Sequence, residues 1–310
     1  MVGRLLRLLA PVAALALLVA ACGGSGGGAD GGTLTVVATT TQAADLVRDV
    51  GGPRVRVVGL LAPNADPHGY EVRPDDVKAL VDAALVVRSG GDVDGWLQSA
   101  VEASGTDAPT VTLLRAARVR RVDGHVDPHW WQDPRNGIRA AAALRAALAR
   151  VDPAGAAGYR TRAATLERRL RALDASVAEC LDQISADRRK LVTTHDGLGY
   201  YADRYGLDVV GAVIPSLSTR GQPSAGDTAA LIDTIRRECV RAIFAESSVN
   251  PKVEEAIARE TGARIGRPLS ADSLGPAESA AATYTGSIAA NTRAIADGLS
   301  GGAVTCRLPA

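Results

Sequence analysis

One order of strands and helices occurs twice along this chain of 310 residues. Residues 34–41 read LTVVATTT, a β-branched run that predicts a strand, and a helical pattern over 42–50 and a second strand over 55–61 follow. Residues 191–214 repeat this order, with a strand that ends in Thr-Thr, a helix, a glycine and another strand. Strands that alternate with helices predict a parallel sheet covered by helices on both faces. We therefore expect an α/β fold with two similar lobes.

The agreement between the two halves continues beyond these segments, although chance similarity of the patterns is an alternative. Each half goes on with a helix and a strand, a third helix and a fourth strand, over residues 76–88, 95–104 and 110–114 and over 227–244, 251–261 and 264–269. Each lobe is thus predicted to hold a mainly four-stranded parallel sheet flanked by helices.

A long helical pattern lies between the two halves. Residues 159–184 contain no Gly or Pro, and apolar residues recur in them at helical spacing, namely Leu166, Leu170, Leu173, Val177 and Leu181. At 1.5 Å per residue this is a helix of about 40 Å, which predicts one rigid connection between the lobes. Two shorter helices with a kink are the alternative. The expected boundaries are 33–150 for the N-terminal lobe, 151–186 for the connecting helix and 187–310 for the C-terminal lobe.

The first residues have the pattern of a secretion signal. Residues 1–21 carry two arginines and then an apolar run that is too short to span a bilayer, which is typical of a signal peptide. The small residues before Cys22 resemble a lipoprotein cleavage site, and the Gly-rich residues 22–32 predict a flexible tether. We expect an extracytoplasmic protein, anchored to the outer face of the cytoplasmic membrane by a lipid on Cys22. A buried cysteine at the end of a short anchor is the alternative.

Composition narrows the class of partner. The chain is 46% hydrophobic and 22% charged, which excludes intrinsic disorder, and its formal net charge is +1 with no basic patch. Nucleic acid is therefore not an expected partner. We expect a monomer that binds a small ligand.

Four potential metal ligands follow predicted strands. His68 and His129 each end an Asp-Pro-His tripeptide, in which proline restricts the turn that presents the histidine. His195 follows the first strand of the second half, and Asp272 follows its last. Open α/β sheets bind ligands beyond the carboxyl ends of their strands. Since two residues come from each lobe, all four are expected to meet in the cleft between the lobes.

Three imidazoles and one carboxylate favour a first-row divalent cation, because magnesium and calcium prefer oxygen ligands. The set predicts zinc first and manganese second, against the alternative that each histidine is a turn residue bonded to backbone. Glu246 is a candidate to orient a ligand histidine, or equally to cap the next helix. His125 lies in an Arg-rich loop that we expect to be mobile, with at most a transient hold on metal. Residues 130–131, both tryptophan, are expected to wall the site, with a sugar-binding platform as the alternative.

With Cys22 assigned to the lipid, an odd number of cysteines remains for an oxidising compartment. One disulfide and one free thiol are expected. Cys306 is the preferred member of the pair, and Cys180 is preferred to Cys239 as its partner. Thiolate binding of the metal is not expected, because the chain contains no Cys-x-x-Cys.

Five segments in this order resemble the zinc- and manganese-specific solute-binding lipoproteins of ABC importers. They are DPHGYEVRP, DPHWWQDPRN, LVTTHDGLGYYADRYGL, IFAESSVNPK and ADSLG. The resemblance implies two lobes, a rigid connecting helix, and a cleft metal held by His68, His129, His195 and Asp272. Because a glutamate tends to replace the third histidine in manganese-binding members, His195 implies the zinc branch. Many zinc members have a long His-rich loop before the second ligand, whereas this one is short and holds only His125.

These observations predict a receptor that captures Zn²⁺ and delivers it to an ABC permease, and not an enzyme. A manganese receptor of the same type is the nearest alternative. A zinc hydrolase is a second alternative, although no His-Glu-x-x-His motif is present. An adhesin with a structural metal is a third.

Overall fold

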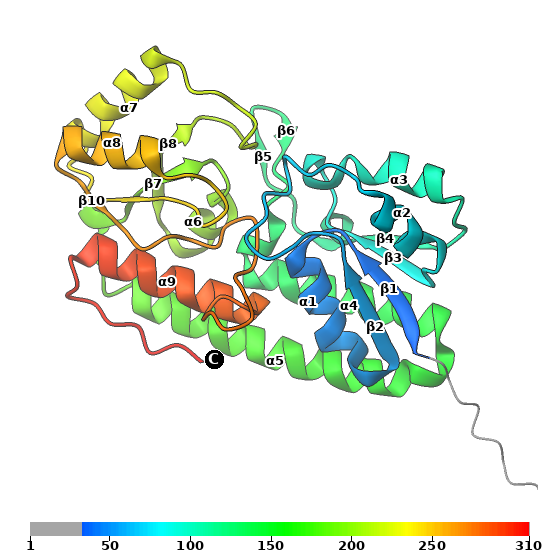
Figure 1. Cartoon of the computed structure of the whole chain (residues 1–310). Helices are drawn as coiled ribbons and strands as arrows, with labels where there is room; N and C mark the ends of the chain where they lie inside the picture. The colour runs from blue at the N-terminus through cyan, green and yellow to red at the C-terminus, as the bar shows by residue number, and fades with distance from the viewer. Residues whose placement is uncertain (1–32, 310) are drawn as a thin grey trace, which may run out of the picture. The chain divides into compact units, whose positions relative to one another are not determined.

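Two four-stranded parallel sheets form the framework of the protein (Figure 1). The computed structural model describes residues 33–309. The predicted signal peptide over 1–21, the tether over 22–32 and the lipidation site Cys22 lie outside the described residues. Within the described part, no helix is both long and apolar enough to cross a bilayer.

The first sheet has the strand order β2-β1-β3-β4. Its strands are β1 (Leu34–Ala38), β2 (Val55–Gly59), β3 (Leu85–Arg88) and β4 (Thr110–Thr112), and its helices are α1 (Thr41–Gly51), α2 (Pro74–Val81), α3 (Leu97–Ser104) and α4 (Pro134–Val151). Val36 and Val37 are both fully buried although their side chains point to opposite faces. Both faces of the sheet are therefore covered, as its uninterrupted apolar strands predict. We call this part the first lobe.

The second sheet has the order β10-β9-β7-β8, which is the same topology read from the other edge. Its strands are β7 (Lys190–His195), β8 (Asp208–Ile214), β9 (Ala242–Phe244) and β10 (Arg264–Ile265), and its helices are α6 (Gly199–Tyr205), α7 (Ala225–Arg237), α8 (Lys252–Thr261) and α9 (Tyr284–Ser300). We call this part the second lobe. The prediction of two similar α/β lobes is confirmed.

The last predicted strand, 264–269, is wrong in its extent. Pairing with β9 stops after Ile265. Further along the chain, Leu269 pairs only with Glu246, through an isolated bridge. Pro268 between them has no N–H to donate to a neighbouring strand. Gly266 lies against the Phe244 ring, where a Cβ would approach to 2.5 Å. The strand therefore breaks just before the segment that carries Asp272.

The connection between the lobes is α5 (Ala156–Leu181), one continuous helix of 26 residues. The predicted leucines form its buried stripe, including Leu166 and Leu170. The alternative of two shorter helices is therefore wrong. Figure 1 shows α5 in green beneath both sheets, and α9 packs beside it.

Residues 121–126 form a hairpin that was not predicted from the sequence. β5 (Arg121–Val122) pairs with β6 (His125–Val126) in a small antiparallel hairpin. The turn residues Asp123 and Gly124 have φ angles of +49° and +82°. The Asp-Gly pair, which favours such hairpin turns, was the available signal. The expectation that His125 lies in a loop is therefore wrong.

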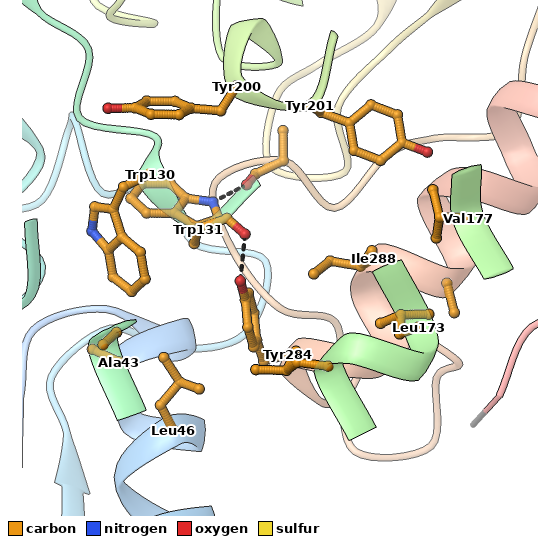
Figure 2. Close-up of a cluster of buried hydrophobic side chains, with 14 of the residues drawn as sticks. Ala43, Leu46, Trp130, Trp131, Leu173, Val177, Tyr200, Tyr201, Tyr284 and Ile288 are labelled. Carbon is orange, nitrogen blue, oxygen red and sulfur yellow. Dashed lines mark hydrogen bonds between the residues drawn. The ribbon is translucent and has the colours of Figure 1, made fainter. Parts of the chain in front are cut away.

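The adjacent tryptophans Trp130 and Trp131 belong to the largest hydrophobic core (Figure 2). Trp130 and Trp131 are 0% and 2% exposed, so a sugar-binding platform is excluded. The Trp130 indole donates to Ser89 at 3.0 Å. The backbone oxygen of Trp131 accepts a 2.7 Å hydrogen bond from the Tyr284 hydroxyl, which links the first lobe to α9 (Figure 2).

A disulfide between Cys180 and Cys306 joins the end of α5 to the segment after α9, with the two Cα atoms 5.4 Å apart. Cys239 is exposed and is the free cysteine of the described residues. The bridge lies at the far end of the connecting helix from the first sheet.

Candidate metal centre

The four predicted ligands reach one point from four segments of chain. His195 is the last residue of β7, and Asp272 follows the break after β10. His68 lies in the loop between β2 and α2, and His129 lies between β6 and α4. Parallel sheets present their strand ends at one edge, and the two lobes turn these edges toward each other.

One ligand atom from each of these residues lies within 4.8 Å of the others. Asp272 Oδ2 is 3.3 Å from the Nε2 atoms of both His68 and His195, and Asp272 Oδ1 is 3.5 Å from His129 Nε2. The Nε2 atoms of His129 and His195 are 3.1 Å apart. A tetrahedral zinc site with bonds of about 2.0–2.1 Å separates its ligand atoms by about 3.3 Å. The contacts of Asp272 and the His129–His195 pair, at 3.1–3.5 Å, have the spacing of such a shell.

Burial makes this cluster costly without a cation. His129, His195 and Asp272 are fully buried, and His68 is 6% exposed. Among the described residues, His68 Nε2 and both carboxylate oxygens of Asp272 have no hydrogen-bond partner. Buried polar atoms are almost always paired, so atoms left open toward a common centre indicate a bound group.

Two carboxylates orient the rings of His129 and His195 through hydrogen bonds to Nδ1, the ring nitrogen that faces away from the cluster. His129 Nδ1 donates to Asp127 Oδ1 at 2.7 Å, and His195 Nδ1 donates to Glu246 Oε1 at 2.6 Å. A proton on Nδ1 leaves the Nε2 lone pair free to face the centre. Glu246 therefore takes the orienting position that we considered for it, and the N-cap of α8 is Pro251.

Asp127 is a site residue to which the sequence patterns assigned no role. Its place two residues before His129 was the available signal in the sequence. The Asp127 side chain also accepts the backbone N–H of His129 at 3.0 Å.

The electrostatics of the ion-free centre favour a positive charge. Burial disfavours the charged form of His195, but the carboxylates of Glu246 and Asp272 outweigh it and raise the pKa of His195 to about 10. Burial likewise opposes ionisation of Asp272, but His195 and His129 hold the pKa of this carboxyl below its usual value. The centre therefore retains a proton in the place where a cation would bind.

The segment that carries Asp272 is held by the first lobe. The backbone oxygen of Ala271 accepts from Trp131 Nε1 at 2.8 Å and from Gln132 Nε2 at 2.7 Å. The Leu274 N–H donates to Thr41 Oγ1 at 2.8 Å. Trp131 also packs against His129, with ring centroids 5.4 Å apart. It therefore walls the site and restrains two of the four predicted ligands.

His125 stays outside this cluster. It is exposed, and it lines an open groove of about 740 Å³ together with Asp196 and Ser216. The structure thus brings together all four predicted ligands and leaves His125 at the surface.

Comparison with known proteins agrees with this geometry. Residues 36–298 match the family described as "ZnuA: Zinc-uptake complex component A periplasmic". The manganese-binding lipoprotein MntA of Bacillus subtilis is 30% identical over 272 residues, which cover 84% of this chain and 88% of MntA. The iron-binding protein YfeA of Yersinia pestis is 29% identical over 265 residues, covering 84% of each protein.

Among solved structures, the periplasmic zinc-binding protein TroA from Treponema pallidum superposes with a TM-score of 0.81 at 28% identity. The match covers 86% of this chain and 99% of TroA. The family is described as a component of a metal-uptake complex and these relatives are named as metal-binding proteins, so this chain is a metal-binding transport receptor and not a hydrolase. With a family match that spans most of its length, this chain belongs to the ZnuA family of solute-binding proteins that serve metal-importing ABC transporters.

Proposed function

We propose that this protein captures Zn²⁺ outside the cytoplasm and delivers it to an ABC import permease. Family membership supports the capture of a divalent metal for import. The choice of zinc depends on one observation: three imidazoles and one carboxylate, all buried, converge with their ligand atoms within 4.8 Å of one another, and the Nε2 contacts to Asp272 and between His129 and His195 measure 3.1–3.5 Å. Three imidazoles and one carboxylate at this spacing form a closed four-ligand shell for zinc.

Manganese is the second candidate, because relatives at similar identity are named for manganese, iron or zinc. One feature of the site favours it. Both oxygens of Asp272 face the cluster without a hydrogen-bond partner among the described residues, so the carboxylate can bind through both and add a fifth ligand atom. Manganese accepts more oxygen ligands than a closed zinc shell offers.

A competition experiment separates the two ions. Chelator-treated protein is titrated calorimetrically with Zn²⁺, with Mn²⁺, and with each ion in the presence of the other. We expect zinc to bind with submicromolar affinity and to displace manganese. Tighter binding of manganese, or zinc binding only at millimolar concentration, would overturn the zinc assignment. A His68→Ala, His195→Ala double variant should bind neither ion tightly.

We also propose an organisation for the whole chain. We place a signal peptide at 1–21, a tether at 22–32, and the lobes at 33–150 and 187–310 around a connecting helix at 151–186. Acylated Cys22 would anchor a monomer to the outer face of the membrane. Mass spectrometry of the membrane-extracted protein should find a diacylglyceryl group on Cys22, and Cys22→Ala should release the protein from the membrane.

A further inference from the structure

The two Asp-Pro-His turns that present His68 and His129 share one local geometry. The His68 N–H donates to Asp66 Oδ1 at 2.9 Å, and the His129 N–H donates to Asp127 Oδ1 at 3.0 Å. In each turn the aspartate thus folds back on the backbone of the histidine two residues later. The two turns differ in what holds the aspartate.

The carboxylate of the aspartate in the second turn has its partners within the first lobe, whereas the second lobe reaches only the backbone of this turn, where the Tyr200 hydroxyl donates to the Asp127 backbone oxygen at 3.1 Å. Asp127 Oδ2 accepts from Arg120 Nη1 at 3.0 Å, and Arg120 lies only seven residues earlier. Asp127 Oδ1 also accepts the Nδ1 proton of His129 at 2.7 Å. Backbone and ring of His129 are therefore oriented by neighbours in sequence.

The aspartate of the first turn is held from the other lobe. Asp66 Oδ2 accepts a hydrogen bond of 2.6 Å from the Thr219 hydroxyl, 153 residues away. Thr219 lies between β8 and α7 of the second lobe. A hydroxyl that donates to a carboxylate at this distance forms a charge-assisted hydrogen bond, stronger than one between neutral groups.

We infer that Thr219 is a positioning residue for the ligand His68, and that of the two aspartates in these turns Asp66 is the one whose carboxylate depends on contact between the lobes. This inference rests on the proposed function, in which His68 holds the ion. Separation of the segment around Thr219 from the first lobe removes one of the two hydrogen bonds to the Asp66 carboxylate, whereas the Asp127 carboxylate keeps its bonds from Arg120 and His129. The ion then loses His68 before His129.

Three variants test the role of the hydroxyl. Thr219→Val removes it with little change of shape, and Thr219→Ser retains it. Thr228→Val is the matched control, because the Thr228 hydroxyl donates only locally, to the backbone oxygen of Ser224 at the N-cap of α7. All three are made in the full chain, and thermal unfolding checks that they fold.

The first measurement is hydrogen exchange in the ion-free protein. In Thr219→Val we expect amides of residues 66–70 to exchange about tenfold faster, the factor that corresponds to one hydrogen bond to a charged acceptor. Residues 127–131 should exchange as in the native chain, and Thr219→Ser should restore native rates. Equal exchange of residues 66–70 in the native chain and Thr219→Val would overturn the inference.

The second measurement is zinc release to an excess of chelator, followed by stopped flow. We expect Thr219→Val to release zinc about tenfold faster, with Thr219→Ser and Thr228→Val at the native rate. An unchanged release rate in Thr219→Val contradicts the role in ion retention. If the native chain binds no zinc, the proposed function is contradicted. The role of Thr219 is then decided by hydrogen exchange in the ion-free protein alone.

Discussion

His195 Nδ1 donates a 2.6 Å hydrogen bond to Glu246, which links the end of β7 to the bridge that follows β9. The Glu246 carboxylate also accepts the backbone N–H of His195 at 3.2 Å. One buried side chain therefore sets both the position and the proton of a proposed ligand.

Removal of the Glu246 charge should weaken zinc binding. In Glu246→Gln we expect a loss of affinity of about 10–100-fold, because partners behind metal-binding histidines make contributions of this size. Glu255→Gln, on the exposed side of α8, is the control. Calorimetric titration measures both, and native affinity in Glu246→Gln would contradict the orienting role.

Zinc binding should release a proton near neutral pH. The pKa of His195 in the ion-free protein is raised to about 10, so the ring is protonated at pH 7.5 and must lose its proton to bind zinc. Because one proton must leave the ring before zinc binds, the zinc affinity should fall about tenfold for each unit by which the pH is lowered below about 10. Calorimetry in buffers of different ionisation enthalpy counts the protons. A binding enthalpy that does not depend on the buffer would contradict this prediction.

The ion-free protein should stay folded. Its largest hydrophobic core takes residues from both lobes and includes none of the four proposed ligands. We expect chelator treatment to leave the far-ultraviolet circular dichroism unchanged, whereas zinc at 1,000 times its Kd adds about 4 kcal/mol to the free energy of unfolding. Unfolding on removal of the metal would instead favour a structural metal, as in the adhesin alternative.

Trp131 should matter for binding and Trp130 for stability. Trp131→Phe removes one of the two hydrogen bonds to Ala271 and loosens the segment of Asp272, so zinc affinity should fall about three- to tenfold. Trp130→Phe removes the bond to Ser89 within the core and should mainly lower the melting temperature. Calorimetry and thermal unfolding of the two variants distinguish these effects. Equal effects on affinity would contradict the assignment.

The disulfide should stabilise the fold without contributing to the site. A Cys180→Ser, Cys306→Ser variant should lose about 2–5 kcal/mol of unfolding free energy, because the bridge closes a long loop. Its zinc affinity should equal that of the native chain. Denaturant unfolding and calorimetry measure the two quantities, and a change in affinity would indicate coupling between the bridge and the cleft.

Local patterns in the sequence were sufficient to predict most of the framework. The β-branched run of β1 and the leucine stripe of α5 specify their elements through side-chain periodicity, which acts between near neighbours. The same reasoning placed His195 and Asp272 beyond strand ends. It failed at Pro268, where loss of an N–H outweighed the pattern, and at Asp123-Gly124, where a turn signal was overlooked.

The sequence by itself determined the two lobes, the connecting helix and the residue types offered at the strand ends, because each depends on short-range periodicity. Only the tertiary structure decided how these ends meet. The hydrogen bonds from Trp131 to Ala271 and from Thr219 to Asp66 join residues 140 and 153 positions apart. Such pairs depend on how two packed lobes approach each other, and no local pattern in the chain encodes that approach.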